Sequence, residues 1–286
     1  MILLTRQPVE LNRPMQSAVR KMFDDPVLED TIVERITYLS DGLKINGYLA
    51  RPKAEGRYPV LIWNRGGSGD HGALDDLRAY LILASTAIWG YVVLSTQYRG
   101  NAGSEGAEDW GGKDLDDSLR LVDVASEIEQ ADTVRIGVEG ASRGGMTTYR
   151  ALATDHPFKC AIVHAGIADL FALQNEKEDF RLFLDRLFGH LGPQDKLEAL
   201  RNRSAIHLAD KFRKDVPILI LHGTDDNTIP FSQSESLVNR LKEAGIPHEF
   251  VPLLGGGHVA LKDGSYREAD KLRKVWLSRY LKGDPD

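Results

Sequence analysis

A serine flanked by glycines offers the clearest chemistry in this chain. Residues 140–144 read Gly-Ala-Ser-Arg-Gly, which places Ser142 at the centre of a G-x-S-x-G pattern. The apolar run 134–138 precedes this pattern and a segment typical of a helix follows it. A serine between a strand and a helix sits on a sharp, strained turn with its hydroxyl exposed, and glycines permit the close approach of strand and helix. We therefore predict that Ser142 is a nucleophile.

An acid and a histidine follow this serine in the order of a catalytic triad. The apolar run 216–221 predicts a buried strand, and it leads into a polar loop that contains Asp226. A second run, residues 249–254, leads into a glycine-rich loop that ends at His258. The order serine, acid, histidine is that of α/β-hydrolases. We expect His258 to take the Ser142 proton and Asp226 to orient the imidazole, so that an acyl-enzyme forms.

Other side chains compete for two of these roles. Asp225 is adjacent to Asp226, and Asp169 follows an earlier strand; we favour Asp226 as the acid. Among the eight histidines, His222 begins a turn and His164 ends an apolar run. A structural hydrogen-bonding role is expected for His222, and His164 is expected to be a satisfied core or rim group. His258 is therefore favoured as the base.

The negative charge that develops on the substrate oxygen needs two hydrogen-bond donors. The backbone N–H of Arg143, directly after the nucleophile, is expected to supply one. The other is expected from the loop after the first parallel strand, residues 64–69, with Arg65 and Gly66 as candidates. Glycines in this loop let its backbone approach the substrate.

Composition narrows the class of protein. The net charge is −6 and no basic stripe is visible, which argues against a nucleic-acid partner. The single cysteine, Cys160, cannot form an internal disulfide and is expected in a buried strand. The apolar N-terminal stretch is too short for a signal peptide, and no stretch reaches the length of a membrane span. We predict a cytoplasmic protein without a membrane partner.

Neither a cofactor nor a metal is expected. The cluster Asp70, His71, Asp75 and Asp76 is better explained as the capped start of a helix than as a metal site. The predicted substrate is a small molecule or a short peptide. The oligomeric state is open, and a homo-oligomer is one of the alternatives.

The order of predicted elements indicates an α/β fold. Two alternating segments around Asp41 and Gly42 predict an antiparallel hairpin, and strands then alternate with helices. This order predicts a mostly parallel central sheet with helices on both faces. Residues 170–213 interrupt the repeat and predict a helical lid inserted into the domain. We expect an N-terminal arm at 1–31 and an α/β-hydrolase domain at 32–286.

Four motifs together make the chain resemble the catalytic domain of the prolyl oligopeptidase family of serine peptidases. They lie at residues 98–104, 140–145, 222–230 and 257–258. The resemblance implies an α/β-hydrolase fold and acyl transfer through a triad whose acid is the fifth residue of H-G-x-x-D, here Asp226. Two features depart from the family pattern. We expect no β-propeller in this chain, and residues 64–67 lack the tyrosine that several members use as an oxyanion donor, so a backbone N–H of Arg65 or Gly66, or the Arg65 side chain, has to replace it.

The predicted function is therefore that of a serine hydrolase acting on peptide, amide or ester bonds, with a prolyl-oligopeptidase-like peptidase favoured. A carboxylesterase is the first alternative, and a non-catalytic α/β-hydrolase that binds a small molecule or a partner is the second. An exopeptidase also needs a carboxylate for the substrate amine, and Glu176 and Glu178 in the insertion are candidates by position.

Overall fold

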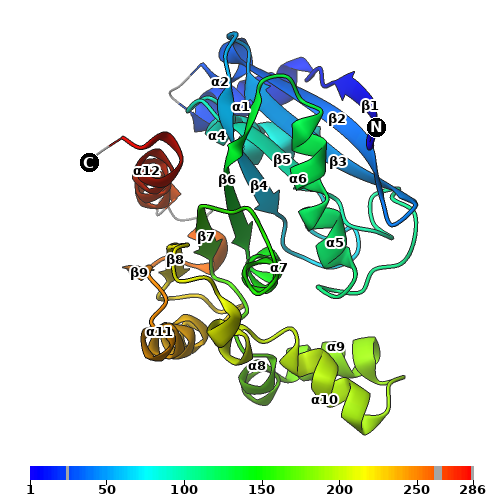
Figure 1. Cartoon of the computed structure of the whole chain (residues 1–286), viewed down its shortest axis with the longest axis vertical. Coiled ribbons are helices and arrows are strands. Elements are labelled where there is room, and N and C mark those ends of the chain that lie inside the picture. The colour runs from blue at the N-terminus through cyan, green and yellow to red at the C-terminus, as the bar shows by residue number, and fades with distance from the viewer. Residues whose placement is uncertain (24–25, 261–265, 285–286) are drawn as a thin grey trace. The chain divides into compact units, whose positions relative to one another are not determined.

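The chain folds into strands and helices that form two compact units (Figure 1). The computed structural model describes residues 1–23, 26–260 and 266–284. Unit 1 comprises residues 1–138 and the C-terminal segment that begins at Arg279, and unit 2 comprises residues 139–278. The chain is an α/β protein, as predicted. Its division into an arm at 1–31 and a domain at 32–286 stays a prediction.

Unit 1 contains a mixed sheet in which β4 and β5 are parallel and the other neighbours are antiparallel. The strands lie in the order β1-β2-β3-β5-β4. Asp41 and Gly42, with φ of 50° and 79°, form the tight turn between β2 and β3, which confirms the predicted hairpin. The strands are β1 (Leu3–Pro8), β2 (Thr31–Ser40), β3 (Leu43–Pro52), β4 (Tyr58–Asn64) and β5 (Val92–Thr96).

The N-terminal region contributes both a strand and a helix to unit 1. Strand β1 pairs with β2, and only Leu3 of its six residues is buried, so the sequence carries no alternation that signals a strand. The sequence predicts a helix near residues 15–23, and the structure has α1 (Arg13–Met22) there. The Asn12 side chain caps it by accepting a hydrogen bond from the Met15 N–H at 3.0 Å.

Helices cover both faces of the unit 1 sheet. Figure 1 shows α5 and α6 in front of the strands and the earlier helices behind them. The sequence of residues 73–89 predicts a single helix, but a π-helical turn, Tyr80–Ala84, divides it. Asp75 accepts a hydrogen bond from the Arg78 N–H at 2.8 Å, so this aspartate caps a helix as expected. The helices are α2 (Val27–Asp30), α3 (Asp76–Ala79), α4 (Ser85–Ala87), α5 (Asp114–Leu119) and α6 (Leu121–Ser126).

Unit 2 contains a parallel sheet that carries the candidate residues at its carboxyl ends. Strand β6 (Ala131–Ala141) begins in unit 1, and its last three residues, 139–141, belong to unit 2. The neighbouring strands β7 (Cys160–His164), β8 (Ile218–Gly223) and β9 (His248–Leu253) pair in parallel. Every residue of β7 and β8 is buried, which is typical of a parallel sheet covered on both faces.

Six α-helices of unit 2 connect or follow these strands among the described residues. Helices α8, α9 and α10 lie between Leu170 and Arg201 of the segment 170–213, which confirms that the insertion is helical. Leu173, Leu184 and Phe188 are buried there, whereas Leu182 and Leu197 are exposed. The helices are α7 (Arg143–Leu152), α8 (Leu170–Glu176), α9 (Glu178–Phe188), α10 (Pro193–Arg201), α11 (Ser232–Ala244) and α12 (Tyr266–Leu277).

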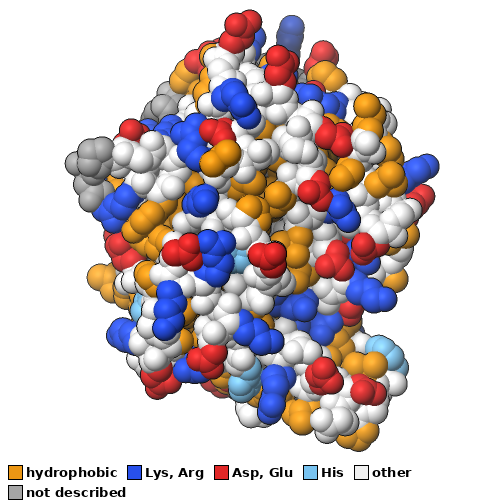
Figure 2. Space-filling view, in the orientation of Figure 1, with side chains coloured by type: hydrophobic (Ala, Val, Ile, Leu, Met, Phe, Trp, Pro, Cys, Tyr) orange, Lys and Arg blue, Asp and Glu red, His pale blue; other side chains and the backbone are white. Residues whose placement is uncertain are grey.

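The surface mixes charges of both signs. On the face that Figure 2 shows, basic and acidic side chains are interspersed. Within the described ranges, no helix combines the length and the apolar character that crossing a membrane requires.

Candidate active site

Ser142 lies on a strained turn between β6 and α7. Its φ of 56° and ψ of −121° are unusual for a residue with a side chain. The Ser142 N–H donates to the His164 carbonyl at 2.9 Å, and its own carbonyl accepts from the Met146 N–H at 3.2 Å. The predicted strand–turn–helix arrangement is therefore present, and the surrounding hydrogen bonds hold a conformation that costs free energy.

Steric contacts explain the glycines around Ser142. A Cβ atom on Gly140 would lie 2.2 Å from the Gly144 carbonyl oxygen. A Cβ atom on Gly145 would lie 2.6 Å from the Cα atom of Gly166 and 2.7 Å from a methyl carbon of Val163. These distances are far below van der Waals contact, so the turn excludes any larger residue at either position.

The loops after β8 and β9 are bound to each other, which brings the acid to the histidine. A Cβ atom on Gly223 would lie 2.1 Å from the Gly256 carbonyl oxygen, so the two backbones touch. The Asp225 N–H donates to that same carbonyl at 3.0 Å. These contacts fix the start of the loop that holds Asp226 against the loop that holds His258.

The structure brings Asp226 and His258 together. His258 Nδ1 lies 2.7 Å from Asp226 Oδ2. The other carboxylate oxygen accepts from the N–H groups of Thr228 at 2.8 Å and Ile229 at 2.9 Å. The Asp226 side chain is fully buried, whereas 25% of the His258 side chain is exposed. Next to His258, Val259 has a φ of 61°, a strained conformation for a β-branched residue.

The Asp226 carboxyl is held in its ionised form. Burial by itself raises the pKa of Asp226, but hydrogen bonds from His222 and His258, the charge of His258 and the Ile229 N–H outweigh it. The pKa of Asp226 therefore lies well below its usual range. A carboxylate in contact with Nδ1 selects the imidazole tautomer whose Nε2 is free to accept a proton.

The other candidate acids point elsewhere. Asp225 is exposed, and its carboxylate accepts from the Thr224 hydroxyl at 3.1 Å. Asp169 caps α8 by accepting from the Phe171 N–H at 2.8 Å. Both interactions are local, so the geometry supports Asp226 over these two aspartates.

His222 contacts the acid directly, a contact that the sequence pattern did not predict. Its Nε2 lies 3.0 Å from the Ile229 carbonyl oxygen and 3.3 Å from Asp226 Oδ2. Both oxygens only accept, so Nε2 carries the hydrogen and Nδ1 accepts from the Ser234 hydroxyl at 2.7 Å. The expected hydrogen-bonding role is present, and it includes orientation of Asp226. The H-G-x-x-D spacing was the available signal, since a histidine four residues before the acid shares its turn.

The candidate oxyanion donors belong to different units. Arg143 is the first residue of α7 in unit 2, whereas Arg65 and Gly66 follow β4 in unit 1. The Arg65 guanidinium donates to the carbonyls of Gln97 at 2.8 Å and Gly69 at 3.0 Å. This side chain is therefore engaged with neighbouring loops of unit 1, which leaves the backbone N–H groups as the better donors.

A comparison with protein families decides the classification. Residues 78–284 match the model of the prolyl oligopeptidase family. The chain belongs to this family. The matched segment contains Ser142, Asp226 and His258, and it begins after the loop that contains Arg65 and Gly66.

Known members of the family differ in length from this chain. YtmA of Bacillus subtilis, named as an uncharacterized peptidase, is 30% identical over 215 residues, which cover 75% of this chain and 81% of YtmA. Dipeptidyl-peptidase 5 of Porphyromonas endodontalis is 30% identical over 82% of this chain, but this chain spans only 35% of that protein. The chain therefore corresponds to about four-fifths of one relative and to about a third of the other.

Solved structures agree on the fold. An acylaminoacyl peptidase of Pyrococcus horikoshii matches with a TM-score of 0.75 and 25% identity, covering 89% of this chain and 42% of that one. A puromycin-hydrolyzing peptidase of Mycobacterium tuberculosis matches with a TM-score of 0.73 and 24% identity, covering 87% of this chain and 40% of that one. These matches confirm the α/β-hydrolase fold. Membership of the prolyl oligopeptidase family shows that the protein is a serine hydrolase.

Proposed function

We propose that this family member is a serine peptidase that cleaves amide bonds of short peptides through Ser142, Asp226 and His258. The observation that carries the proposal is the hydrogen bond from His258 Nδ1 to the buried Asp226 carboxylate, in the same unit as a serine on a strained turn. The names of the relatives, among them a dipeptidyl-peptidase and an acylaminoacyl peptidase, favour amide substrates.

The reaction begins when His258 Nε2 accepts the Ser142 proton and the serine oxygen attacks the acyl carbon. Asp226 stabilises the imidazolium that forms, because its carboxylate stays ionised. The tetrahedral oxyanion accepts a hydrogen bond from the Arg143 N–H, and Arg65 and Gly66 remain the candidates for a second backbone donor. His258 then donates its proton to the leaving amine, and the C–N bond breaks. Water activated by His258 hydrolyses the resulting ester and regenerates Ser142.

The helices α8–α10 are the proposed lid. Two contacts anchor the end of α8 to the acid loop and to the start of α11. Lys177 Nζ donates to the Asn227 carbonyl at 2.6 Å, and the Ser232 hydroxyl donates to Glu176 at 3.3 Å. Asn227 is adjacent to Asp226, so this connection supports a role of the insertion in selecting short substrates.

The test compares substrates and probes on the full chain. Aminoacyl- and peptidyl-arylamides should be hydrolysed, and a fluorophosphonate probe should label the wild type but not Ser142→Ala. Strong turnover of short nitrophenyl esters without any turnover of arylamides would replace the peptidase by a carboxylesterase. Folded protein that neither reacts with the probe nor turns over either substrate would indicate a binding protein.

A further inference from the structure

A buried carboxylate lies three residues before the nucleophile. Glu139, in β6, has a side chain that is only 2% exposed. Its Oε1 accepts from His164 Nε2 at 2.8 Å and from Arg273 Nε at 2.7 Å, and its Oε2 accepts from Arg273 Nη2 at 3.0 Å. Burial alone raises the pKa of Glu139, but the charge of Arg273 and the hydrogen bond from His164 lower it to about 2. Glu139 is therefore ionised at neutral pH.

One partner of Glu139 is attached to the turn that holds Ser142. The ring of His164 binds Glu139, and the carbonyl of His164 accepts the Ser142 N–H at 2.9 Å. The following residue, Ala165, has a φ of 44°, and Gly166 packs against Gly145 of α7. A displacement of the His164 ring is therefore expected to move the backbone that supports the nucleophile.

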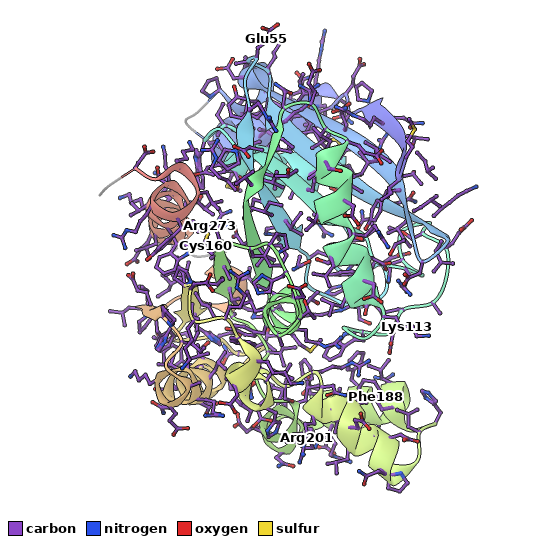
Figure 3. The ribbon with its side chains drawn as sticks, in the orientation of Figure 1. Glu55, Lys113, Cys160, Phe188, Arg201 and Arg273 are labelled. Carbon is purple, nitrogen blue, oxygen red and sulfur yellow. The ribbon has the colours of Figure 1, made fainter. Side chains whose placement is uncertain are left out.

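The other partner of Glu139 comes from the segment that follows the proposed base. Arg273 lies on α12, the next helix in the chain after the His258 turn. Its side chain is 8% exposed, and its Nη1 also donates to Asp270 at 2.7 Å. Arg273 is labelled beside α12 in Figure 3. The ion pair thus links the strand that leads to Ser142 with the helix that follows His258.

We propose that Glu139, His164 and Arg273 form a brace that positions Ser142 relative to His258. This inference rests on the proposed function, because it assigns positioning residues to that same site. Misplacement of reacting groups by about 1 Å can cost roughly 100-fold in rate. A buried ion pair, by contrast, contributes little net stability compared with well-packed apolar residues of similar volume. Replacing the ion pair by apolar side chains therefore separates its contribution to the reaction rate from its contribution to stability.

The decisive variants are Glu139→Gln, Arg273→Met and the double variant Glu139→Leu/Arg273→Met. Glu34→Gln is the matched control, since Glu34 is also a buried glutamate and accepts hydrogen bonds from Arg6 and Arg51 in unit 1. The Tm, the fraction of protein labelled by the fluorophosphonate, kcat, KM and the low-field NMR signal of the His258 Nδ1 proton are measured for each protein.

We expect the double variant to keep a Tm close to that of the wild type and to lose about 10- to 100-fold in kcat per labelled site, with KM within about twofold. Its His258 proton signal should shift or broaden. Glu34→Gln should lower the Tm and leave kcat and this signal unchanged.

The brace is refuted if all three variants, Glu139→Gln, Arg273→Met and the double variant, keep both the wild-type kcat per labelled site and the wild-type His258 signal. If the wild type itself has no activity, the proposed function fails, and the NMR signal still decides the brace.

Discussion

At the scale of single residues, the acid is the assignment that the structure sharpens most. Two adjacent aspartates follow β8, and residue type alone does not distinguish them. The difference arises because the turn after Gly223 directs Asp226 inward to His258 and leaves Asp225 exposed. Such a difference depends on backbone geometry, which periodicity and spacing do not contain.

This difference predicts unequal effects for the two conservative substitutions. Asp226→Asn should lower kcat by about 10⁴-fold, as the corresponding change does in serine peptidases, because the amide favours the wrong imidazole tautomer. Asp225→Asn should change kcat by less than about threefold, since its contact with Thr224 is exposed. Steady-state kinetics with an arylamide substrate measure both. A larger loss for Asp225→Asn would reassign the acid.

Ser234 predicts a smaller effect through His222. Removal of its hydroxyl in Ser234→Ala leaves His222 Nδ1 without the hydrogen bond that fixes the tautomer donating to Asp226. A typical hydrogen bond is worth about 1 kcal/mol, so we expect a loss of about fivefold in kcat. Ser126→Ala, on α6 of unit 1, is the control, because that hydroxyl donates to the Asp123 carbonyl instead. Equal kcat values for the two variants would contradict this role.

The ionisation of Glu139 predicts how stability depends on pH. Its pKa is about 2 in the folded protein and about 4.3 in an unfolded chain. Because the folded pKa is the lower one, the stabilisation is complete above about pH 5 and is lost as the pH falls towards 2. Urea unfolding measures the free energy of unfolding at each pH from 7 to 2. This free energy should fall further for the wild type than for Glu139→Gln, by on the order of 3 kcal/mol. Parallel curves would exclude an ionised Glu139.

At the scale of elements, the junction between β6 and α7 determines the geometry of the nucleophile. Sequence patterns predicted this junction, the β2–β3 hairpin and the parallel strands β7 and β8, because apolar runs and turn residues mark their ends. They missed β1, which has one buried residue, and the π-helical turn that divides the helix at 73–89. They also missed the brace, because Arg273 is one of several charged residues in α12 and nothing in the sequence marks it as buried. A lone glutamate at the end of an apolar strand was the available signal for Glu139.

Gly145→Ala tests the packing of this junction. The new Cβ atom would lie 2.6 Å from the Cα atom of Gly166, so α7 or the segment after β7 has to move. Overpacking of this kind costs about 1–3 kcal/mol, and we expect a lower Tm together with a lower fluorophosphonate labelling rate. Gly192→Ala is the control, because its Cβ atom would lie 3.6 Å from the Asp195 carboxylate, an ordinary contact. Unchanged labelling by Gly145→Ala would show that the turn tolerates this shift.

At the scale of the whole molecule, the proposed triad lies within unit 2, and the second proposed oxyanion donor lies in unit 1. The fold class followed from the order of elements, since alternating strands and helices permit few topologies. The pairing of distant loops could not be predicted, because it depends on contacts such as Gly223 against Gly256. The sequence predicted that the insertion is helical. Its effect on substrate choice depends on how these helices pack, which the spacing of apolar residues does not contain.

Removal of α9 and α10 tests the proposed lid. A flexible linker in place of residues 178–201 leaves α8 and its contact from Lys177 to Asn227 intact. We expect short arylamides to be hydrolysed with a similar kcat and a raised KM, because binding contacts are lost while the triad is retained. Peptides longer than the wild type accepts should be cleaved faster. The control for surface effects is the double variant Leu182→Ser/Leu197→Ser. It keeps the helices and changes only exposed side chains. An unaltered dependence on peptide length in the shortened protein would mean that these helices do not select the substrate.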